Sequence, residues 1–119
     1  MRKRLLIVED SEINRDLLVQ LFEDDYDLDL ADDGQSAIRL ATEKRPDLIL
    51  LDIGLPGLSG LEAVRTLRAR GDDVPIVAVS SSVMPGDRER ALEAGCDDFV
   101  PKPIDDLLLV DLVGRLVSR

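Results

Sequence analysis

Short runs of apolar residues alternate along the chain with longer stretches in which apolar and polar residues mix. The clearest run covers residues 48–51, four large aliphatic residues that lead directly to the carboxylate of Asp52. Such a run is typical of a strand that is buried on both faces, as in a parallel sheet between helices. Residues 5–8 and 76–80 form similar runs. The pattern therefore predicts a buried sheet whose strands end in polar residues.

The mixed stretches between these runs predict helices, because their apolar residues lie three or four positions apart. Ser11 suits the N-cap of the first helix, which is expected to reach about residue 24. The later helices are expected over residues 34–44, 61–71, 86–94 and 105–117. For the first helix, the expected buried stripe consists of Ile13, Leu17 and Leu21, widened by Leu18 and Phe22.

The fourth helix differs from the others because Leu92 is its only large apolar residue, and Leu92 is therefore the residue expected to anchor it to the core. Gly95 is the expected residue at its C-terminal end. With so little apolar surface to bury, we expect this helix to be the least firmly held of the five.

Two further strands are predicted at residues 26–30 and 98–102. Within residues 26–30 every second residue is an aspartate, which suits a strand at the edge of a sheet, where charge discourages pairing with other chains. A calcium-binding loop that starts at Asp29 is excluded, because Ala31 and Leu40 would then occupy positions that need oxygen ligands. Five strands thus alternate with five helices, which predicts an α/β, doubly wound fold with right-handed crossovers and helices on both faces of a parallel sheet.

Length and composition narrow the function. The 119 residues suffice for one domain with a real core, and we expect a single domain over residues 1–119 without an output domain. A net charge of −10 argues against binding nucleic acid. No apolar run is long enough to cross a membrane, and the single cysteine suits a cytoplasmic protein. Because the chain has no histidine, any metal site must use oxygen ligands, which favours magnesium, manganese or calcium.

Polar residues gather at the ends of the predicted strands. Glu9 and Asp10 follow the first strand, Asp52 ends the third, Ser80 ends the fourth and Lys102 ends the fifth. The carboxyl ends of parallel strands share one edge of a sheet, where ligands bind in open α/β folds. Carboxylates close together repel one another, and a hard divalent cation relieves that repulsion. A carboxylate beside such an ion can attack phosphorus, so the pattern suggests phosphoryl transfer to an aspartate.

These residues resemble the motifs of the receiver domains of two-component response regulators, and the resemblance covers essentially the whole chain. It lies in Glu9–Asp10, the segment LLDIGLPGLSG at residues 50–60, Ser80, Phe99 and Lys102–Pro103. It implies a flavodoxin-like three-layer (βα)5 sandwich with strand order 2-1-3-4-5. In that order the aspartate-rich strand lies at an edge, and the first and third strands are neighbours.

The resemblance also implies roles for the acidic residues. Asp52 is the expected phosphoacceptor. Glu9, Asp10 and Asp52 are expected ligands of Mg²⁺, with the backbone carbonyl of Gly54 as another. Lys102 is expected to pair with the phosphoryl group. Such a domain is not an enzyme with a separate substrate, but a phosphoacceptor that catalyses its own phosphoryl transfer and dephosphorylation.

Ser80 and Phe99 are the expected switch pair. In the family the hydroxyl moves to the phosphoryl group and the aromatic ring turns inward into the space that is left. The peptide bond between Lys102 and Pro103 is expected to be cis, which is otherwise rare.

The expected partner is a histidine kinase or a histidine phosphotransfer protein, because the family receives its phosphoryl group from a phosphohistidine. By the same resemblance the donor docks beside the first helix, at Ile13, Asn14 and Leu17. The pair Asn14–Arg15 is similar to receivers of hybrid histidine kinases and of stand-alone regulators such as DivK. The downstream protein partner is not identified by the sequence.

The last helix carries more apolar residues than one buried face needs. Only Asp111, Gly114 and Arg115 interrupt its apolar residues between positions 107 and 117. A partner or homodimer surface across the fourth and fifth helices, with Leu109 as a test position, is therefore one expectation. The alternative is that the core wraps more deeply around this helix.

Other functions on similar folds fit less well. A haloacid-dehalogenase-type phosphatase needs a second acid two residues after its nucleophile, where this chain has Gly54. A flavodoxin needs a phosphate-binding loop after the first strand, where Glu9–Asp10 and Glu12 would repel phosphate. A protein-interaction adaptor that works without phosphorylation remains the alternative to the receiver.

Overall fold

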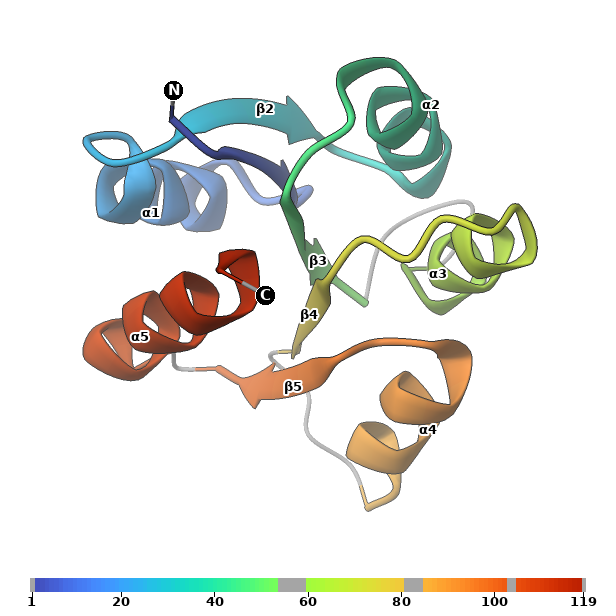
Figure 1. The fold of residues 1–119 in the computed structure, drawn as a ribbon. Coiled ribbons are helices and arrows are strands. Elements are labelled where there is room, and N and C mark those ends of the chain that lie inside the picture. The colour runs from blue at the N-terminus through green and yellow to red at the C-terminus, as the bar shows by residue number, and fades with distance from the viewer. Residues whose placement is uncertain (1, 54–59, 81–84, 103–104, 119) are drawn as a thin grey trace.

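Strands and helices alternate along the described residues, as predicted (Figure 1). The structure is a computed structural model that describes residues 2–53, 60–80, 85–102 and 105–118. The strands are β1 (Arg4–Val8), β2 (Asp27–Ala31), β3 (Leu48–Asp52), β4 (Ile76–Ser80) and β5 (Asp98–Pro101). The helices are α1 (Glu12–Phe22), α2 (Gly34–Lys44), α3 (Gly60–Ala69), α4 (Asp87–Ala94) and α5 (Asp106–Val117).

All neighbouring strands pair in parallel, in the order β2-β1-β3-β4-β5. The register places Ile7 of β1 opposite Leu30 of β2 on one side and Leu50 of β3 on the other. This is the doubly wound order that was predicted, and it puts β2 at one edge and β5 at the other. The charge on β2 is partly paired, since Arg4 Nη1 lies 2.8 Å from Asp29 Oδ2.

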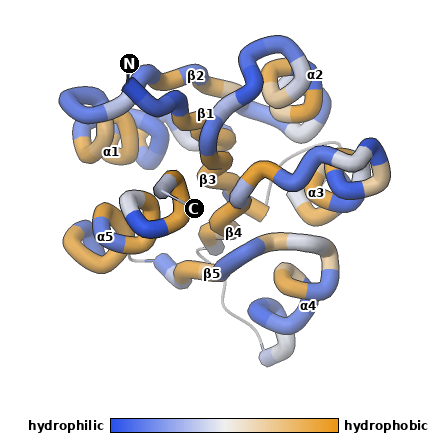
Figure 2. The backbone as a smooth tube through the Cα atoms, in the orientation of Figure 1, coloured by the Kyte–Doolittle hydropathy of each residue, from blue (hydrophilic) through white to orange (hydrophobic). Residues whose placement is uncertain are grey.

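The core consists of two hydrophobic clusters, one on each face of the sheet. Alternate residues of a strand point to opposite faces, so Leu5 and Ile7 join the cluster under α1 and α5. Leu6 and Val8 join the cluster under α2, α3 and α4. The central strands are predominantly hydrophobic in Figure 2, as a sheet covered on both faces requires.

Side chains at the helix starts fix where the chain leaves the sheet edge. The hydroxyl oxygen of Ser11 accepts the N–H of Asn14 at 3.4 Å, as expected for the N-cap of α1. Asp33 caps α2 by accepting the N–H of Ser36 at 2.7 Å. That hydrogen bond lowers the pKa of the Asp33 carboxyl. Ser11 lies three residues after the end of β1, and Asp33 lies two residues after the end of β2. Both caps therefore help to fix the loops at the carboxyl ends of these strands.

The buried face of α1 differs from the prediction. The fully buried residues are Leu18 and Phe22, whereas Ile13 is 75% exposed and Leu17 is 59% exposed. The predicted stripe is therefore wrong at Ile13 and Leu17. Its third residue, Leu21, is partly buried and packs against the core, and the widening residues Leu18 and Phe22 form the buried contact.

The prediction for α4 is also wrong about its contact residue. Leu92 is 39% exposed, and the helix packs on the sheet through Ala91 and Ala94. Small side chains let the helix approach the sheet closely, and they were not recognised as a buried face because each contributes little area. Gly95 ends the helix as predicted, with its N–H donating to the carbonyls of Ala91 and Leu92.

On α5 the core does wrap more deeply around the helix at Leu109, Leu112, Val113 and Leu116, which are buried. Leu109 has no exposed surface and so cannot serve as a test position for a partner surface. The exposed apolar side chains of this helix are instead Leu107, Leu108 and Val110. None of the described helices combines the length and hydropathy that crossing a bilayer requires.

Candidate functional site

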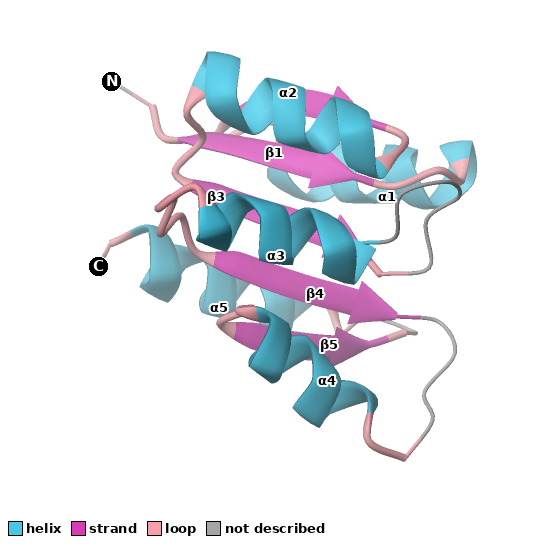
Figure 3. Cartoon of the chain, turned by 90° about the vertical axis from the view of Figure 1, so that its right-hand side faces the viewer, coloured by secondary structure: helices cyan, strands magenta, loops and turns pink. Residues whose placement is uncertain are grey.

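The predicted site residues lie at one edge of the sheet. The arrowheads of the strands in Figure 3 all point to the same side, so the strand ends meet there. The register pairs Val8 with Leu51, so Glu9 and Asp10 follow β1 at the level of Asp52 in β3. On the other side of β3, the ends of β4 and β5 bring Ser80 and Lys102 to the same edge.

Three carboxylates form a cluster at this edge. One carboxylate oxygen each from Glu9, Asp10 and Asp52 lies within 4.8 Å of the other two. Glu9 is only 1% exposed, Asp52 is partly buried and Asp10 is exposed. Three negative charges at this separation repel one another, and a hard divalent cation is the group that such an oxygen set binds well. The residues present therefore fit a metal ion of the magnesium type.

Lys102 is the cation that this cluster already holds. Its ammonium nitrogen Nζ lies 2.7 Å from Glu9 Oε1 and 3.8 Å from Asp52 Oδ2. Its backbone N–H donates to the carbonyl of Ser80 at 2.7 Å, which fixes the start of the side chain at the end of β5. Because the side chain is largely buried, its charge is little screened by solvent, and it can stabilise negative charge beside Asp52.

Backbone contacts hold Glu9 in place. Its N–H donates to the carbonyl of Ala31 at 3.0 Å. Its carboxylate Oε2 accepts the N–H of Ser11 at 3.3 Å. The carbonyl of Glu9 also accepts a hydrogen bond from Arg15 Nη1 at 3.4 Å. A buried carboxylate needs such partners to remain stable in the folded protein.

Gly60 is a residue of this site that sequence reasoning missed. A Cβ atom at this position would lie 2.6 Å from Ile53 Cα and 2.8 Å from the carbonyl oxygen of Asp52. Only a residue without a side chain allows α3 to start against the backbone that carries Asp52. The composition of residues 50–60 could not reveal this, since Gly60 is one of three glycines in that segment.

The predicted switch residues lie on β4 and β5. Ser80 is buried at the end of β4, and Phe99 of β5 is 7% exposed, opposite Ala78. Phe99 belongs to the hydrophobic cluster under α2, α3 and α4. Next to it, Arg88 Nη1 of α4 donates to Asp98 Oδ1 at 3.2 Å and to the backbone carbonyl of Phe99 at 3.4 Å.

The remaining predicted positions divide into two groups. Ile13 and Leu17 are exposed on α1, and Asn14 between them is partly exposed. Gly54 and Pro103 lie outside the described residues, so their predicted roles stay predictions.

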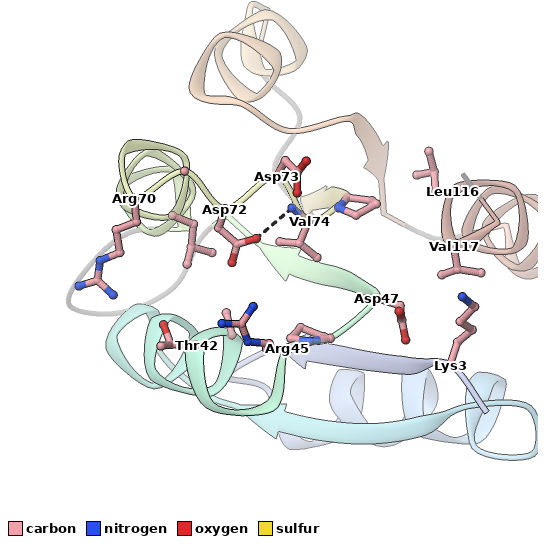
Figure 4. A pocket seen from close by; sticks show the side chains of 15 residues that line it. Lys3, Thr42, Arg45, Asp47, Arg70, Asp72, Asp73, Val74, Leu116 and Val117 are labelled. Atoms are coloured by element: carbon pink, nitrogen blue, oxygen red, sulfur yellow. Dashed lines mark hydrogen bonds between the residues drawn. The ribbon is translucent and has the colours of Figure 1, made fainter. Parts of the chain in front are cut away.

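A hollow of about 600 Å³ lies at the other end of the sheet, where the strands begin (Figure 4). Lys3, Arg45 and Arg70 line it together with three aspartates. Two of these aspartates already bind backbone N–H groups: Asp47 binds that of Arg4, and Asp72 binds that of Val74. The charges of this hollow balance, and among the described residues that line it no set of convergent groups is comparable to the acidic cluster.

Comparison with known proteins agrees with the resemblance to receiver domains that the sequence motifs show. The family model of the response regulator receiver domain matches residues 5–114. The polar-differentiation response regulator DivK of Brucella anthropi is 43% identical over 109 residues, which cover 87% of both chains. Mycobacterial response regulators are 39–40% identical over 98% of this chain, and the chain spans about half the length of these curated relatives.

Solved structures of receiver domains have the same fold. The receiver domain of the sensor histidine kinase PA1611 from Pseudomonas aeruginosa, with a magnesium ion coordinated in its active-site cleft, matches with a TM-score of 0.91. It is 34% identical, with all of both chains covered. The receiver domain of Ssk1 from Saccharomyces cerevisiae, crystallised with the phosphotransfer protein Ypd1, matches with a TM-score of 0.91. It is 30% identical over 98% of this chain and 90% of that one. With this fold, this cluster of strand-end residues and a family match over most of its length, the chain belongs to the response regulator receiver domains of two-component signalling.

Proposed function

We propose that this chain receives a phosphoryl group on Asp52 from a phosphohistidine of a histidine kinase or a histidine phosphotransfer protein. The observation that carries the proposal is the acidic cluster of Glu9, Asp10 and Asp52, with the ammonium of Lys102 3.8 Å from Asp52 Oδ2. It combines an oxygen nucleophile, a cation site and a fixed positive charge at one strand edge.

In the proposed reaction a carboxylate oxygen of Asp52 attacks phosphorus. The bond between phosphorus and the histidine nitrogen breaks, and its electron pair leaves with the imidazole of the donor. Lys102 stabilises charge on the phosphoryl oxygens, and the Ser80 hydroxyl donates a hydrogen bond to one of them. Glu9, Asp10 and Asp52 would hold Mg²⁺, and the bound ion would supply positive charge against the phosphoryl oxygens. The chain thereby catalyses its own modification. Attack of water on phosphorus then breaks the bond between phosphorus and the Asp52 oxygen, which releases inorganic phosphate and restores the carboxylate.

The proposed donor surface is the start of α1. Ile13 and Leu17 are exposed apolar residues one turn apart, so they lie on the same side of the helix. This helix follows directly from Asp10 and Ser11 at the acidic edge. A donor that packs on Ile13, Asn14 and Leu17 would bring its phosphohistidine to that edge. The phosphotransfer protein crystallised with the Ssk1 receiver is a precedent for such a donor.

The proposed output of phosphorylation is a change on the face formed by α4, β5 and α5. Ser80 and Phe99 lie between the acidic edge and this face, because Ser80 ends β4 and Phe99 lies on the neighbouring strand β5. Phe99 belongs to the same hydrophobic cluster as Ala91 and Ala94 of α4. A downstream protein would read the change on this face.

The experiment is the intact mass after incubation with a small phosphodonor such as acetyl phosphate, with and without Mg²⁺. Four proteins are compared: the parent, Asp52→Asn, Lys102→Met and the control Asp73→Asn. Asp73 is an exposed aspartate at the opposite end of the sheet. We expect a gain of one phosphoryl group that depends on Mg²⁺, disappears in Asp52→Asn and remains in Asp73→Asn.

The same experiment distinguishes a phosphoacceptor from a protein-interaction adaptor that works without phosphorylation. An adaptor that works without phosphorylation would show no gain in mass under conditions that modify a known receiver domain. A gain that persists in Asp52→Asn would instead move the phosphoacceptor to another residue.

A further inference from the structure

Glu9 has a partner on each carboxylate oxygen. Oε1 lies 2.7 Å from Lys102 Nζ, and Oε2 accepts the backbone N–H of Ser11 at 3.3 Å. With 1% of its surface exposed, Glu9 has almost no contact with water that could replace either partner. A cation that enters the acidic cluster therefore meets Lys102 at one of the two oxygens of Glu9.

Of the two partners of Glu9, only Lys102 can move away. The N–H of Ser11 belongs to the backbone, and Ser11 is the N-cap of α1, so its position is fixed by the helix. Lys102 ends in a flexible four-carbon side chain whose base is held by the hydrogen bond to Ser80. A divalent cation at the cluster also repels the ammonium, because like charges a few ångströms apart in a largely buried site are weakly screened.

A second position for Lys102 is already within reach. Its ammonium lies 3.8 Å from Asp52 Oδ2, so a small rotation of the side chain exchanges one carboxylate for the other.

We propose that Glu9 is the resting partner of Lys102, and that a divalent cation bound to the acidic cluster transfers Lys102 from Glu9 to Asp52. This inference rests on the proposed function and adds an order to it, in which the metal binds first and thereby places the lysine on the phosphoacceptor. Glu9 then acts as a positioning residue for Lys102 as well as a metal ligand. By linkage, Lys102 on Glu9 must weaken cation binding by the same factor by which the cation weakens that contact.

The test uses a feature of the composition: the chain has only three lysines, Lys3, Lys44 and Lys102. With lysine selectively labelled with ¹³C at the ε-carbon, NMR gives one side-chain signal for each, and Lys102→Met assigns that of Lys102. We expect titration with MgCl₂ to move the Lys102 signal and to leave the Lys3 and Lys44 signals unchanged. In Glu9→Gln without metal, the Lys102 signal should already differ from that of the parent.

Mg²⁺ affinity, measured by calorimetry, gives a second readout. Removal of the competing charge in Lys102→Met should tighten Mg²⁺ binding by about fivefold or more. Lys44→Met, which removes an exposed lysine of α2 outside the site, should bind as the parent does.

Two different failures are distinguishable. If Mg²⁺ binds but the Lys102 signal stays in place and Lys102→Met binds no more tightly, the transfer of Lys102 is wrong while the receiver function stands. If the parent binds no Mg²⁺ at millimolar concentration, both the transfer and the metal in the proposed function are wrong.

Discussion

Gly60 packs directly on the backbone of Asp52 and Ile53, at the start of α3. A methyl group there would overlap with main-chain atoms, which cannot rotate out of the way as a side chain can. The position of Asp52 therefore depends on a residue that has no functional group of its own.

Gly60→Ala should lower the free energy of unfolding by about 1–3 kcal/mol, which is the usual cost of overpacking. It should also slow phosphorylation of Asp52, because the backbone of that residue must shift. Denaturant unfolding and the rate of mass gain with acetyl phosphate measure the two effects.

Gly114→Ala is the matched control for Gly60→Ala. Gly114 is also a helical glycine, but a methyl group added to it would meet no described atom within 4 Å. This substitution should stabilise the fold by about 0.5–1 kcal/mol. Equal behaviour of the two variants would contradict the packing role of Gly60.

The sequence was sufficient to predict which side chains meet, but not how they pair. Glu9, Asp10, Asp52, Ser80 and Lys102 were found because strand ends of a parallel sheet share an edge, a property of topology alone. The closer contact of Lys102 with Glu9 than with Asp52 depends on the paths of the side chains, which no residue pattern contains. Gly60 was missed because glycine is common in loops for several different reasons.

At the level of elements, α4 is held differently at its two ends. Its C-terminal end is fixed by Arg68, whose guanidinium donates to the carbonyl of Gly95 at 3.0 and 2.8 Å. Its N-terminal end has no side-chain cap, and among the described residues it is joined to β5 by Arg88, through Asp98 and Phe99. Opening of this helix should therefore begin at its first turn.

Arg88→Ala should increase hydrogen exchange in the first turn of α4 by about two- to fivefold, the effect of one exposed ion pair. Arg65→Ala is the control, because Arg65 is an exposed arginine of α3 that lies outside this contact. The increase should shrink at high salt, where exposed ion pairs are screened. Equal exchange in both variants would show that Arg88 does not hold this end of the helix.

Element positions were predicted well and buried faces less well. The bounds of β3, β4 and α2 agree with the prediction because apolar runs and breaking residues mark them clearly. The predicted buried faces of α1 and α4 differ from the observed ones, because periodicity identifies the apolar lines on a helix, whereas the neighbouring elements decide which line is covered. On α5 the sequence left two alternatives open. Leu109 packs into the core, whereas Leu107, Leu108 and Val110 stay exposed, so a partner surface on this helix stays a prediction.

At the level of the whole molecule, alternation of strands and helices was enough to predict a parallel sheet with helices on both faces. It was not enough to predict the order of the strands, which came from the resemblance to receiver domains. Several orders satisfy the same alternation, and the choice depends on contacts between elements far apart in the sequence.

Cys96 offers a test of how the whole molecule opens. It is the only cysteine, it is buried in the cluster under α2, α3 and α4, and burial raises the pKa of its thiol to about 11. Because the thiolate is the reactive form, alkylation at pH 8 should be about 100-fold slower in the native protein than in the unfolded chain. The rate should rise with denaturant as the population of unfolded molecules rises. Rapid alkylation of the native protein, independent of denaturant, would instead indicate local opening around Cys96.

Lys3, before β1, and Val117, at the end of α5, line the same hollow at the end of the sheet opposite to Asp52 (Figure 4). A fluorescent reporter, a surface tether or a fused domain attached near either of these residues would therefore point away from the acidic edge and from the proposed donor surface on α1. The proposed phosphorylation should accordingly be measurable on an immobilised or labelled chain, because the attachment would not block the approach of a donor to α1.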